Sequence, residues 1–494
     1  MKWVSSLLFG STAIAPPATF DAEKTAVAPL AAPMDELRLL LAKGRVVAPT
    51  DDEYATLRIG FNWDCVGHPS AIAMIASEDE VAKVLSFAAK YQIKVGVSAG
   101  RHSHYASISN VLMIDLRELK QVTVDTEVRS VTVQAGAKLL DLDAACAPHN
   151  LATPAGTNPD TGVAGLALGG GVGWLSRKFG LTIDNLISAR VALFNGNIVT
   201  ASESEEKDLF WAIRGGGGNF GVVTEFTLRL HPIPPLLYAG AFVYLPLSFL
   251  PMLSLQPDLA TAMKLNRDFA NTLDNDWYSV MVLTRNAPLI AAYSYAGPDH
   301  DLAKKILAAS PTRALIKDFK PQTYHTGVQR LAQGPDGKGQ SHGYWFEKSL
   351  LLNDLPDAVI DILVRQSANA PSLTGTEIVV QQMDGAVARV PLDATAYAHR
   401  GARYWVMVLA QFDGSAEMRG LAVEWARETT RLLSEFRVGS YQAVGTQHDN
   451  EMKTSGSALV FGSNYARLQE VKRRFDSSNL LCFNQNVVPA ESTS

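Results

Sequence analysis

The stretch that decides the fold runs from Gly156 to Leu186 and reads GTNPDTGVAGLALGGGVGWLSRKFGLTIDNL. In regular structure each glycine costs roughly 0.5–1 kcal/mol relative to alanine. A backbone so stripped of side chains is better explained by close approach to a flat ligand than by packing. A Rossmann-type dinucleotide fingerprint is a weaker alternative, because the run does not sit at the first turn of a βαβ unit. The clustered glycines are Gly162, Gly165, Gly169, Gly170, Gly171 and Gly173.

A second informative stretch lies upstream, where Val97–Ser103 reads VSAGRHS between two strand-like segments. A glycine in a polar turn lets backbone N–H groups crowd against an anion, as pyrophosphate binding requires. His102 in that turn is a nucleophile by residue type, and an imidazole nitrogen can bond to an electrophilic ring methyl. Taken alone, a loop histidine is more often a surface or structural residue, so the motif by itself leaves both interpretations open.

A third stretch, Asp208–Gly221, reads DLFWAIRGGGGNFG. It predicts an amphipathic helix that stops at four glycines and gives way to a strand over 222–230. A helix C-cap needs only one glycine, so this run again indicates a special backbone.

Periodicity along the chain predicts an α+β fold. Ala71–Ala76 is expected to be a buried strand, followed by a helix that Ser77 and Glu80 would start as a capping box. The break in alternation within Val122–Gln134 predicts a hairpin. The Pro-rich segment Pro232–Pro235 marks a domain boundary, beyond which strands are expected at Tyr278–Leu283, Glu377–Gln381 and Tyr404–Gln411.

Composition narrows the function classes. The chain has 494 residues, 47% hydrophobic and 19% charged, with a formal net charge of −5. That balance, without any Lys/Arg-rich run, argues against nucleic-acid binding. Three scattered cysteines give neither a disulfide framework nor zinc-ligand spacing. No run reaches the ~18 apolar residues of a membrane helix, so no membrane span is expected. Residues 1–34 form a leader resembling a secretory signal, which favours a secreted or otherwise exported protein over a cytoplasmic one.

The three segments in this order resemble the FAD-linked oxidases related to vanillyl-alcohol oxidase and para-cresol methylhydroxylase, in the berberine-bridge-enzyme-like branch. VSAGRHS occupies the place of that branch's Arg-Ser-Gly-Gly-His-Ser loop. Residues 161–186 and 208–233 are close to word-for-word, and Phe461–Pro489 (FGSNYARLQEVKRRFDSSNLLCFNQNVVP) is also typical of the branch. The similarity covers about residues 50 to 490.

The resemblance implies a two-lobed FAD-binding domain of the para-cresol methylhydroxylase type, formed by residues 35–235 and 437–490. An α/β substrate domain with an antiparallel sheet would occupy residues 236–436. It also implies one covalent bond, from His102 to the 8α-methyl group of FAD. The residues expected to contact FAD are Ser98, Ala99, Gly100, Arg101, His102, Ser103, Thr161, Gly162, Val163, Gly165, Gly169, Gly170, Gly171, Val223, Asn484 and Asn486.

Two departures from the family pattern matter. Many relatives add a second bond from a cysteine in a Gly-Thr-Cys-Pro context, but here Asn158 stands in that place, so a single covalent link is expected. The family's Tyr-x-Asn motif falls on Tyr441, with Ala443 in place of the asparagine. Tyr441 is the candidate catalytic base, with an ordinary aromatic wall as the alternative interpretation. Reserve candidates are His448, Tyr397, His399 and Tyr344; His399 and Arg400 are expected to make structural hydrogen bonds.

The resulting hypothesis is an FAD-dependent oxidase that takes a hydride from an alcohol, amine or hemiacetal carbon of a small molecule. Dioxygen would then accept the electrons and give hydrogen peroxide, since Val163 and Ala164 are small where relatives admit dioxygen. A dehydrogenase with another acceptor and a flavin-loaded binding protein with decayed catalysis are the alternatives. Residues 236–436 show no carboxylate pair or aromatic cluster that names a substrate, and carbohydrates and nitrogen-containing secondary metabolites both remain open.

Overall fold

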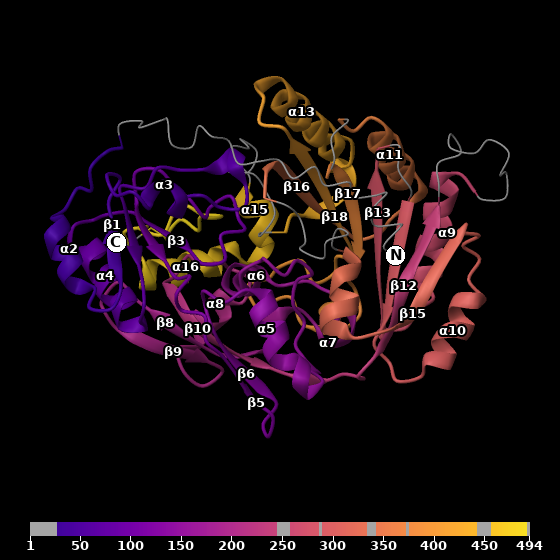
Figure 1. Ribbon diagram of the computed structural model, residues 1–494, viewed down its shortest axis with the longest axis horizontal. Helices are drawn as coiled ribbons and strands as arrows, with labels where there is room; N and C mark the ends of the chain where they lie inside the picture. Colours follow the sequence, from indigo (N-terminus) through magenta and orange to yellow (C-terminus); the bar gives the residue numbers. More distant parts are fainter. Residues whose placement is uncertain are drawn as a thin grey trace.

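The computed structural model describes residues 27–244, 257–285, 289–332, 342–371, 375–441 and 456–491. Figure 1 shows two lobes side by side, with the C-terminal helices returning to the lobe that the N-terminal half forms. Most of the predicted leader lies outside the described residues, so export stays a prediction. No helix in the described ranges combines the length and apolar character that crossing a membrane requires.

The first lobe contains two sheets. In the smaller, an antiparallel strand joins three parallel ones in the order β1-β2-β4-β3. In the larger, five antiparallel strands follow the order β5-β6-β10-β8-β9. Helix α4 (Glu78–Lys90) contacts strands of both sheets and joins them into one core. The strands are β1 (Arg45–Val47), β2 (Ala71–Met74), β3 (Val95–Ser98), β4 (Leu112–Asp115), β5 (Val122–Asp125), β6 (Ser130–Gln134), β8 (Leu186–Ala192), β9 (Ile198–Ser202) and β10 (Val222–Arg229).

The Gly-rich stretch folds as short helices and turns. Its helix α6 lies near the centre of the molecule, between the two lobes (Figure 1). Helix α6 (Val163–Gly169) and helix α7 (Ser176–Phe179) come from it, and α8 (Lys207–Ile213) precedes the four-glycine run. The remaining elements of this part are α2 (Met34–Leu40), α3 (Tyr54–Leu57), α5 (Leu139–Cys146) and the short pair β7 (Leu151–Ala152) and β11 (His231–Pro232).

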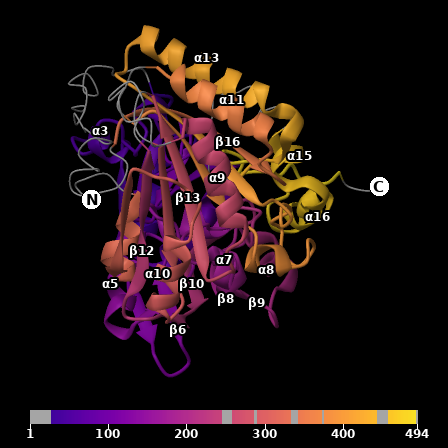
Figure 2. The same cartoon turned by 90° about the vertical axis from the view of Figure 1, so that its right-hand side faces the viewer.

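The second lobe is an eight-stranded antiparallel sheet in the order β15-β12-β14-β13-β17-β18-β16-β19. Helices α9, α11 and α13 pack on its outer face, and Figure 2 shows α11 and α13 running side by side along it. The strands are β12 (Leu237–Tyr244), β13 (Trp277–Thr284), β14 (Leu289–Tyr295), β15 (Ile316–Gln322), β16 (Tyr344–Leu352), β17 (Glu377–Gln382), β18 (Tyr404–Phe412) and β19 (Arg437–Gly439). The helices are α9 (Leu259–Asn271), α10 (His300–Ala308), α11 (Asp357–Ala368), α12 (Ala386–Arg389) and α13 (Ala416–Leu432).

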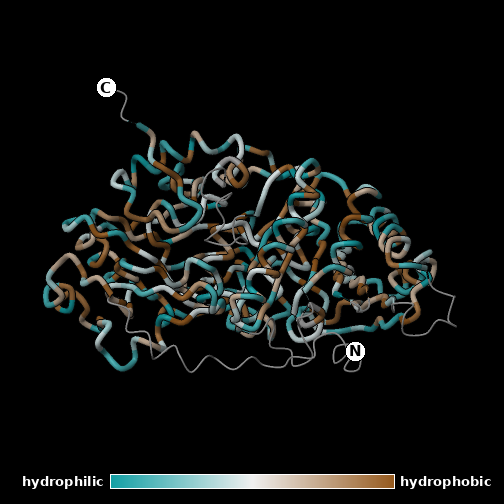
Figure 3. The backbone as a smooth tube through the Cα atoms, turned by 90° about the horizontal axis from the view of Figure 1, so that it is seen from above, coloured by the Kyte–Doolittle hydropathy of each residue, from teal (hydrophilic) through white to brown (hydrophobic). Residues whose placement is uncertain are grey.

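The inner face of this sheet turns toward the first lobe. Along β17 the side chains alternate, so Ile378 and Val380 pack under the helices while Val379 joins the cluster between the lobes. In Figure 3 hydrophobic segments gather inside both lobes and hydrophilic ones are prominent at the periphery. The antiparallel sheet agrees with the expected fold class, whereas the domain limits at 235 and 436 stay a prediction.

The C-terminal segment closes the first lobe through α15 (Gly456–Phe461) and α16 (Tyr465–Phe475). Lys472 is fully buried and donates hydrogen bonds to the Asp476 carboxylate at 2.6 Å and to the backbone oxygens of Asn219 and Leu481. The Asn219 carbonyl belongs to the turn after the four glycines. One buried ammonium group therefore ties the returning segment to the Gly-rich centre.

The elements expected from periodicity are present, with one correction at the start of α4. Ser77 is the N-cap residue, yet its side chain makes no capping hydrogen bond. Instead the Glu80 carboxylate accepts hydrogen bonds from the backbone N–H groups of Lys43, Gly44 and Ala76. The capping box predicted the correct helix start, and Glu80 is also hydrogen-bonded to the Ser77 backbone as that motif requires, but the predicted hydrogen bond of the serine side chain is wrong.

Candidate active site

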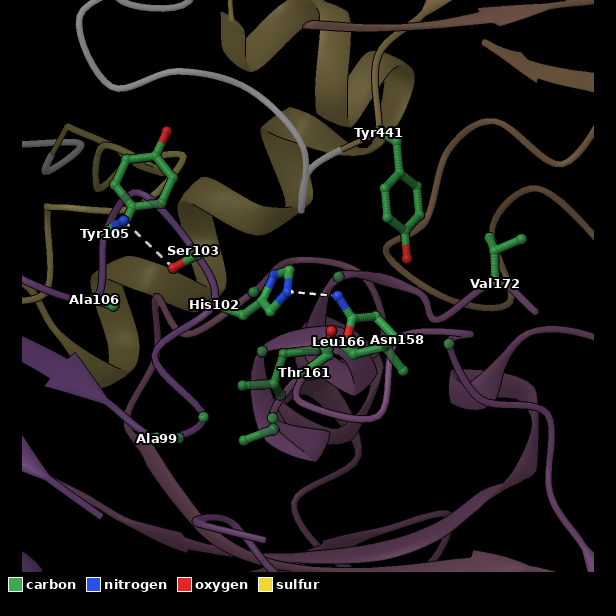
Figure 4. Close-up of a pocket in the computed structure, with 18 of the residues that line it drawn as sticks. Ala99, His102, Ser103, Tyr105, Ala106, Asn158, Thr161, Leu166, Val172 and Tyr441 are labelled. Carbon is green, nitrogen blue, oxygen red and sulfur yellow. Dashed lines mark hydrogen bonds between the residues drawn. The ribbon is translucent and has the colours of Figure 1, made fainter. Parts of the chain in front are cut away.

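A cavity lies between the Gly-rich centre of the first lobe and the inner face of the large sheet. Four parts of the chain line it: the loop after β3, the Gly-rich segments, strands of the second lobe and the C-terminal return. Figure 4 shows His102 and Asn158 meeting at its wall, with Tyr441 entering from the opposite side. The predicted residues that line it are Ala99, Gly100, Arg101, His102, Ser103, Thr161, Gly162, Gly165, Gly169, Val223, Asn484 and Tyr441.

Two loops cross at the cavity wall because both carry glycine. A Cβ atom on Gly100 would lie 2.1 Å from the Cα of Gly162, and one on Gly162 would lie 2.5 Å from the Cα of Gly100. Any side chain at either position would separate the two backbones. Gly165, one turn into α6, differs: a Cβ there would meet nothing within 4 Å, because it would project into open space. That open face is where a flat ligand can rest on backbone.

His102 is held as a neutral imidazole. Its Nε2 lies 3.0 Å from the Asn158 amide nitrogen, which can only donate, so Nε2 carries a lone pair. The ring stacks on Phe61 with centroids 4.0 Å apart. Burial lowers the pKa of His102 to about 4, since among the described residues no carboxylate is hydrogen-bonded to the ring to offset the lost hydration. An unprotonated, fixed imidazole facing the cavity is the form that can act as a nucleophile.

Arg101, next to His102, presents an unpaired cation to the cavity. It adopts a left-handed backbone conformation with φ of 60°, at a position where the family loop has glycine. Its Nε has no hydrogen-bond partner among the described residues, and burial lowers the pKa of the guanidinium to about 10. A partly buried cation that has no ion pair among the described residues is costly. An anionic group such as a pyrophosphate would satisfy it.

Three further residues that the sequence predicts to contact FAD also have polar atoms without a hydrogen-bond partner in the described chain. Ser98 Oγ, Asn484 Oδ1 and Asn486 Oδ1 are buried and lack hydrogen-bond partners. Buried polar atoms are rarely left unpaired. Together with the open face at Gly165 and the free guanidinium, they form a donor and acceptor set that fits FAD: cation and backbone N–H groups for the pyrophosphate, amides for the polar edge of the flavin.

Several predicted contact residues lie just outside the lining. Val163 packs in the core of the first lobe, so the small residue that faces the cavity is Ala164. Gly170 packs against the rings of Tyr441 and Tyr397, and Gly171 against Thr182. Their contact with FAD stays a prediction, as it does for Ser98 and Asn486.

Tyr441 lies 3% exposed with its ring 4.5 Å from Trp405, measured between centroids. Its hydroxyl accepts a hydrogen bond from the backbone N–H of Gly171 at 2.6 Å. Burial raises the pKa of this phenol, and the single N–H donor lowers it too little to compensate. Tyr441 is therefore a protonated phenol at neutral pH before any ligand binds. Ala443, the second departure from the family motif, lies outside the described residues.

The reserve candidates separate clearly, except for His448, which lies outside the described residues. Tyr397 is buried beside Tyr441, and its hydroxyl lacks a partner within the described chain. Tyr344 packs on Trp63, away from the lining. The expected structural role of the other two residues is confirmed: His399 Nε2 lies 2.8 Å from the Leu459 carbonyl, and Arg400 binds Asp184 through two hydrogen bonds of 2.7 Å.

Glu347 also lines the cavity, and no role was expected for it from the sequence. Its carboxylate lies 2.9 Å from Nε2 of His104. The Asn62 amide donates to His104 Nδ1, because its own oxygen already accepts from the backbone N–H groups of Asp64 and Trp345. The ring proton therefore sits on Nε2 and points at Glu347. Although burial alone would raise it, this hydrogen bond holds the pKa of Glu347 below its usual value.

Comparison with known proteins identifies the family to which a chain with this site belongs. Residues 69–202 match the FAD binding domain family, and residues 450–488 match the berberine and berberine-like family. An FAD-linked oxidoreductase of Aspergillus terreus is 31% identical over 451 residues, which cover 86% of this chain and 89% of that protein. The chain belongs to the berberine-bridge-enzyme-like FAD-linked oxidoreductases.

Further relatives of this oxidoreductase are named for their activities. The (R)-6-hydroxynicotine oxidase of Paenarthrobacter nicotinovorans is 27% identical over 92% of this chain and 98% of its own length. The solved structure of a xylooligosaccharide oxidase from Myceliophthora thermophila, in complex with xylobiose, superposes with a TM-score of 0.79 at 25% identity, covering 93% of this chain and all of the other. The expected family, fold and FAD-linked oxidoreductase class are thus confirmed.

Proposed function

We propose that this oxidoreductase is an oxidase that holds FAD through one covalent bond from His102 and passes electrons from a small organic substrate to dioxygen. The observation that carries the proposal is the neutral His102 ring, fixed by Asn158 at the wall of a cavity whose polar groups lack partners. Bound there, FAD supplies the acceptor for a hydride from an alcohol, amine or hemiacetal carbon and the means of reducing dioxygen to hydrogen peroxide.

The chain's own residues position the cofactor and the substrate and tune their reactivity. Asn158 holds the His102 ring and, as an amide, offers no second covalent anchor. Arg101 neutralises the pyrophosphate. Ala164 keeps the wall low near the flavin, which leaves room for dioxygen. Tyr441 stands opposite the loop and accepts the substrate proton, a role that requires the bound substrate or flavin to lower its pKa. Two relatives that are oxidases by name support this assignment over a dehydrogenase.

The covalent bond is tested with His102→Ala. Acid precipitation of the purified wild-type protein is expected to leave the flavin in the pellet, and the variant is expected to release it into the supernatant. His149→Ala, at an exposed histidine of the first lobe, is the matched control. Flavin in the wild-type supernatant would refute the bond.

The acceptor is tested separately. The flavin is reduced anaerobically by a panel of alcohols, amines and sugars and then mixed with air-saturated buffer in a stopped-flow instrument. Rapid bimolecular reoxidation with stoichiometric peroxide is expected. Reduction followed by slow reoxidation would instead identify a dehydrogenase. If no substrate reduces the flavin, the binding-protein alternative is favoured.

A further inference from the structure

The wall that the large sheet contributes to the cavity is mainly apolar. Alternate residues of β13, β14, β17 and β18 point into it: Val282, Ile290, Val379, Trp405, Met407 and Leu409. A sugar presents hydroxyl groups around its ring and needs many polar partners, because each unpaired buried hydroxyl costs free energy. This wall offers few such partners. It suits a substrate with a largely hydrocarbon skeleton.

Besides the indole N–H of Trp405, which lacks a hydrogen-bond partner among the described residues, three polar side chains interrupt that wall, and two of them are already bonded. Gln381 accepts a hydrogen bond from the Tyr278 hydroxyl at 2.7 Å. Glu347 accepts one from His104. Glu377 is different, since its carboxylate has neither a hydrogen bond nor an ion pair among the described residues, and no charged group offsets its burial. Burial alone raises its pKa to about 7.

The sheet register places the two carboxylates in one row. Leu409 of β18 pairs with Glu377 on one side and with Glu347 on the other. Since neighbouring strands lie about 4.8 Å apart, the two glutamate Cα atoms are roughly 10 Å from each other. Glu347 keeps its charge through His104 at the end near the flavin loop. Glu377 lies on β17, two strands away from the β16 strand of Glu347, among the apolar residues of the wall.

We propose that Glu377 is the substrate-recognition residue of this cavity and holds a basic nitrogen carried on an apolar skeleton. The substrate class is therefore a hydrophobic amine, not a carbohydrate. This inference rests on the proposed function, because it assigns the cavity to the substrate of that reaction. An ammonium group would supply the hydrogen-bond donor and the counter-charge that the Glu377 carboxylate lacks among the described residues.

Binding to the flavin-loaded protein tests the proposal with matched pairs of ligands. Each pair consists of a cyclic amine and its neutral oxygen isostere, such as 4-phenylpiperidine and 4-phenyltetrahydropyran, in a series of increasing size beside xylobiose. Calorimetry and the perturbation of flavin absorbance report affinity without requiring turnover. The amines are expected to bind at least about tenfold more tightly than their isosteres, the order expected when a buried charge finds its partner.

Variants connect that preference to one side chain. Glu377→Gln keeps the shape and is expected to lower amine affinity at least about tenfold while leaving the isosteres unchanged. Glu377→Asp should retain most of the preference. Glu127→Gln, at an exposed glutamate, makes the same change in net charge and should have no effect. Circular dichroism and flavin content confirm that the variants are folded.

The outcomes separate this inference from the proposed function. If amines bind through Glu377 but no compound of the alcohol, amine and sugar panel reduces the flavin, the oxidase is overturned and the recognition of a basic nitrogen by Glu377 stands. If xylobiose reduces the flavin equally well in wild type and Glu377→Gln, the oxidase stands and the inference about Glu377 is overturned. Equal affinity for amine and isostere across the whole series, or equal loss of both in Glu377→Gln, overturns the inference.

Discussion

Asn158, which stands where many relatives have a cysteine, makes a contact of its own in the site. Its amide donates to Nε2 of His102 and thereby fixes both the orientation and the protonation of the ring. The sequence indicated only that a second covalent anchor is absent. The structure adds that the residue in its place positions His102, the proposed site of the covalent bond.

A substitution at this residue tests that role. Asn158→Asp would put a carboxylate beside the ring, and a nearby negative charge raises the pKa of His102 from about 4. More of the imidazole is then protonated near neutral pH and cannot act as a nucleophile. Apoprotein reconstituted with FAD is expected to form the covalent bond more slowly than wild type, and increasingly so as pH falls. A rate independent of both substitution and pH would contradict this role.

Tyr441 invites a different test, since its phenol is buried, protonated and bonded to the Gly171 N–H. If it accepts the substrate proton, Tyr441→Phe should slow anaerobic flavin reduction by about 10²–10⁴-fold. It should also cost about 1–3 kcal/mol of stability, because the Gly171 N–H loses its acceptor. A loss of stability with reduction within threefold of wild type would make Tyr441 an aromatic wall.

At the scale of elements, the glycines of the Gly-rich stretch divide into two kinds. Gly100 and Gly162 are needed where two loops touch, whereas Gly165 faces open space on α6. Gly165→Leu is therefore expected to leave the fold intact, since leucine favours a helix over glycine by roughly 0.5–1 kcal/mol. The side chain would project into the flavin's place. The measurement is the ratio of absorbance at 450 and 280 nm, which should fall sharply while circular dichroism is unchanged; full flavin content would show that α6 does not support FAD.

Local patterns explain what the sequence could predict. His102, the Gly-rich stretch and the C-terminal motif each carry a signal within a few consecutive residues, and strand and helix periods are local as well. Glu377 and Glu347 could not be found that way. They lie on different strands and share a row only because both pair with Leu409. The sequence of residues 236–436 shows no carboxylate pair that names a substrate, because the relation between these two glutamates depends on strand register, which sequence periodicity does not specify.

For the whole molecule, pH stability should depend on a histidine at the junction of the lobes. His231 stacks on Phe179 and lies 2.6 Å from Asn185 Oδ1, and burial lowers its pKa to about 4 from an ordinary 6.5. Between those values the unfolded imidazole binds a proton that the folded one does not, so stability falls as pH decreases from 6.5 toward 4. His231→Gln should show a smaller decrease in urea midpoint over that range, and His149→Gln, at an exposed site, the same decrease as wild type. Identical pH profiles for all three proteins would exclude this contribution.

The hydrogen bond from Gln485 to the Tyr105 hydroxyl joins positions 380 residues apart, and both residues line the cavity. At translation rates of about 5–20 residues per second, the ribosome needs roughly 20–80 s to make the chain between them. The nascent protein thus displays the His102 loop long before Asn484 and Gln485 exist to complete its surroundings. If FAD binds as proposed, its site is complete only after this segment has been made and has packed, so the yellow colour of a preparation would report the fraction of molecules that have reached this closed state.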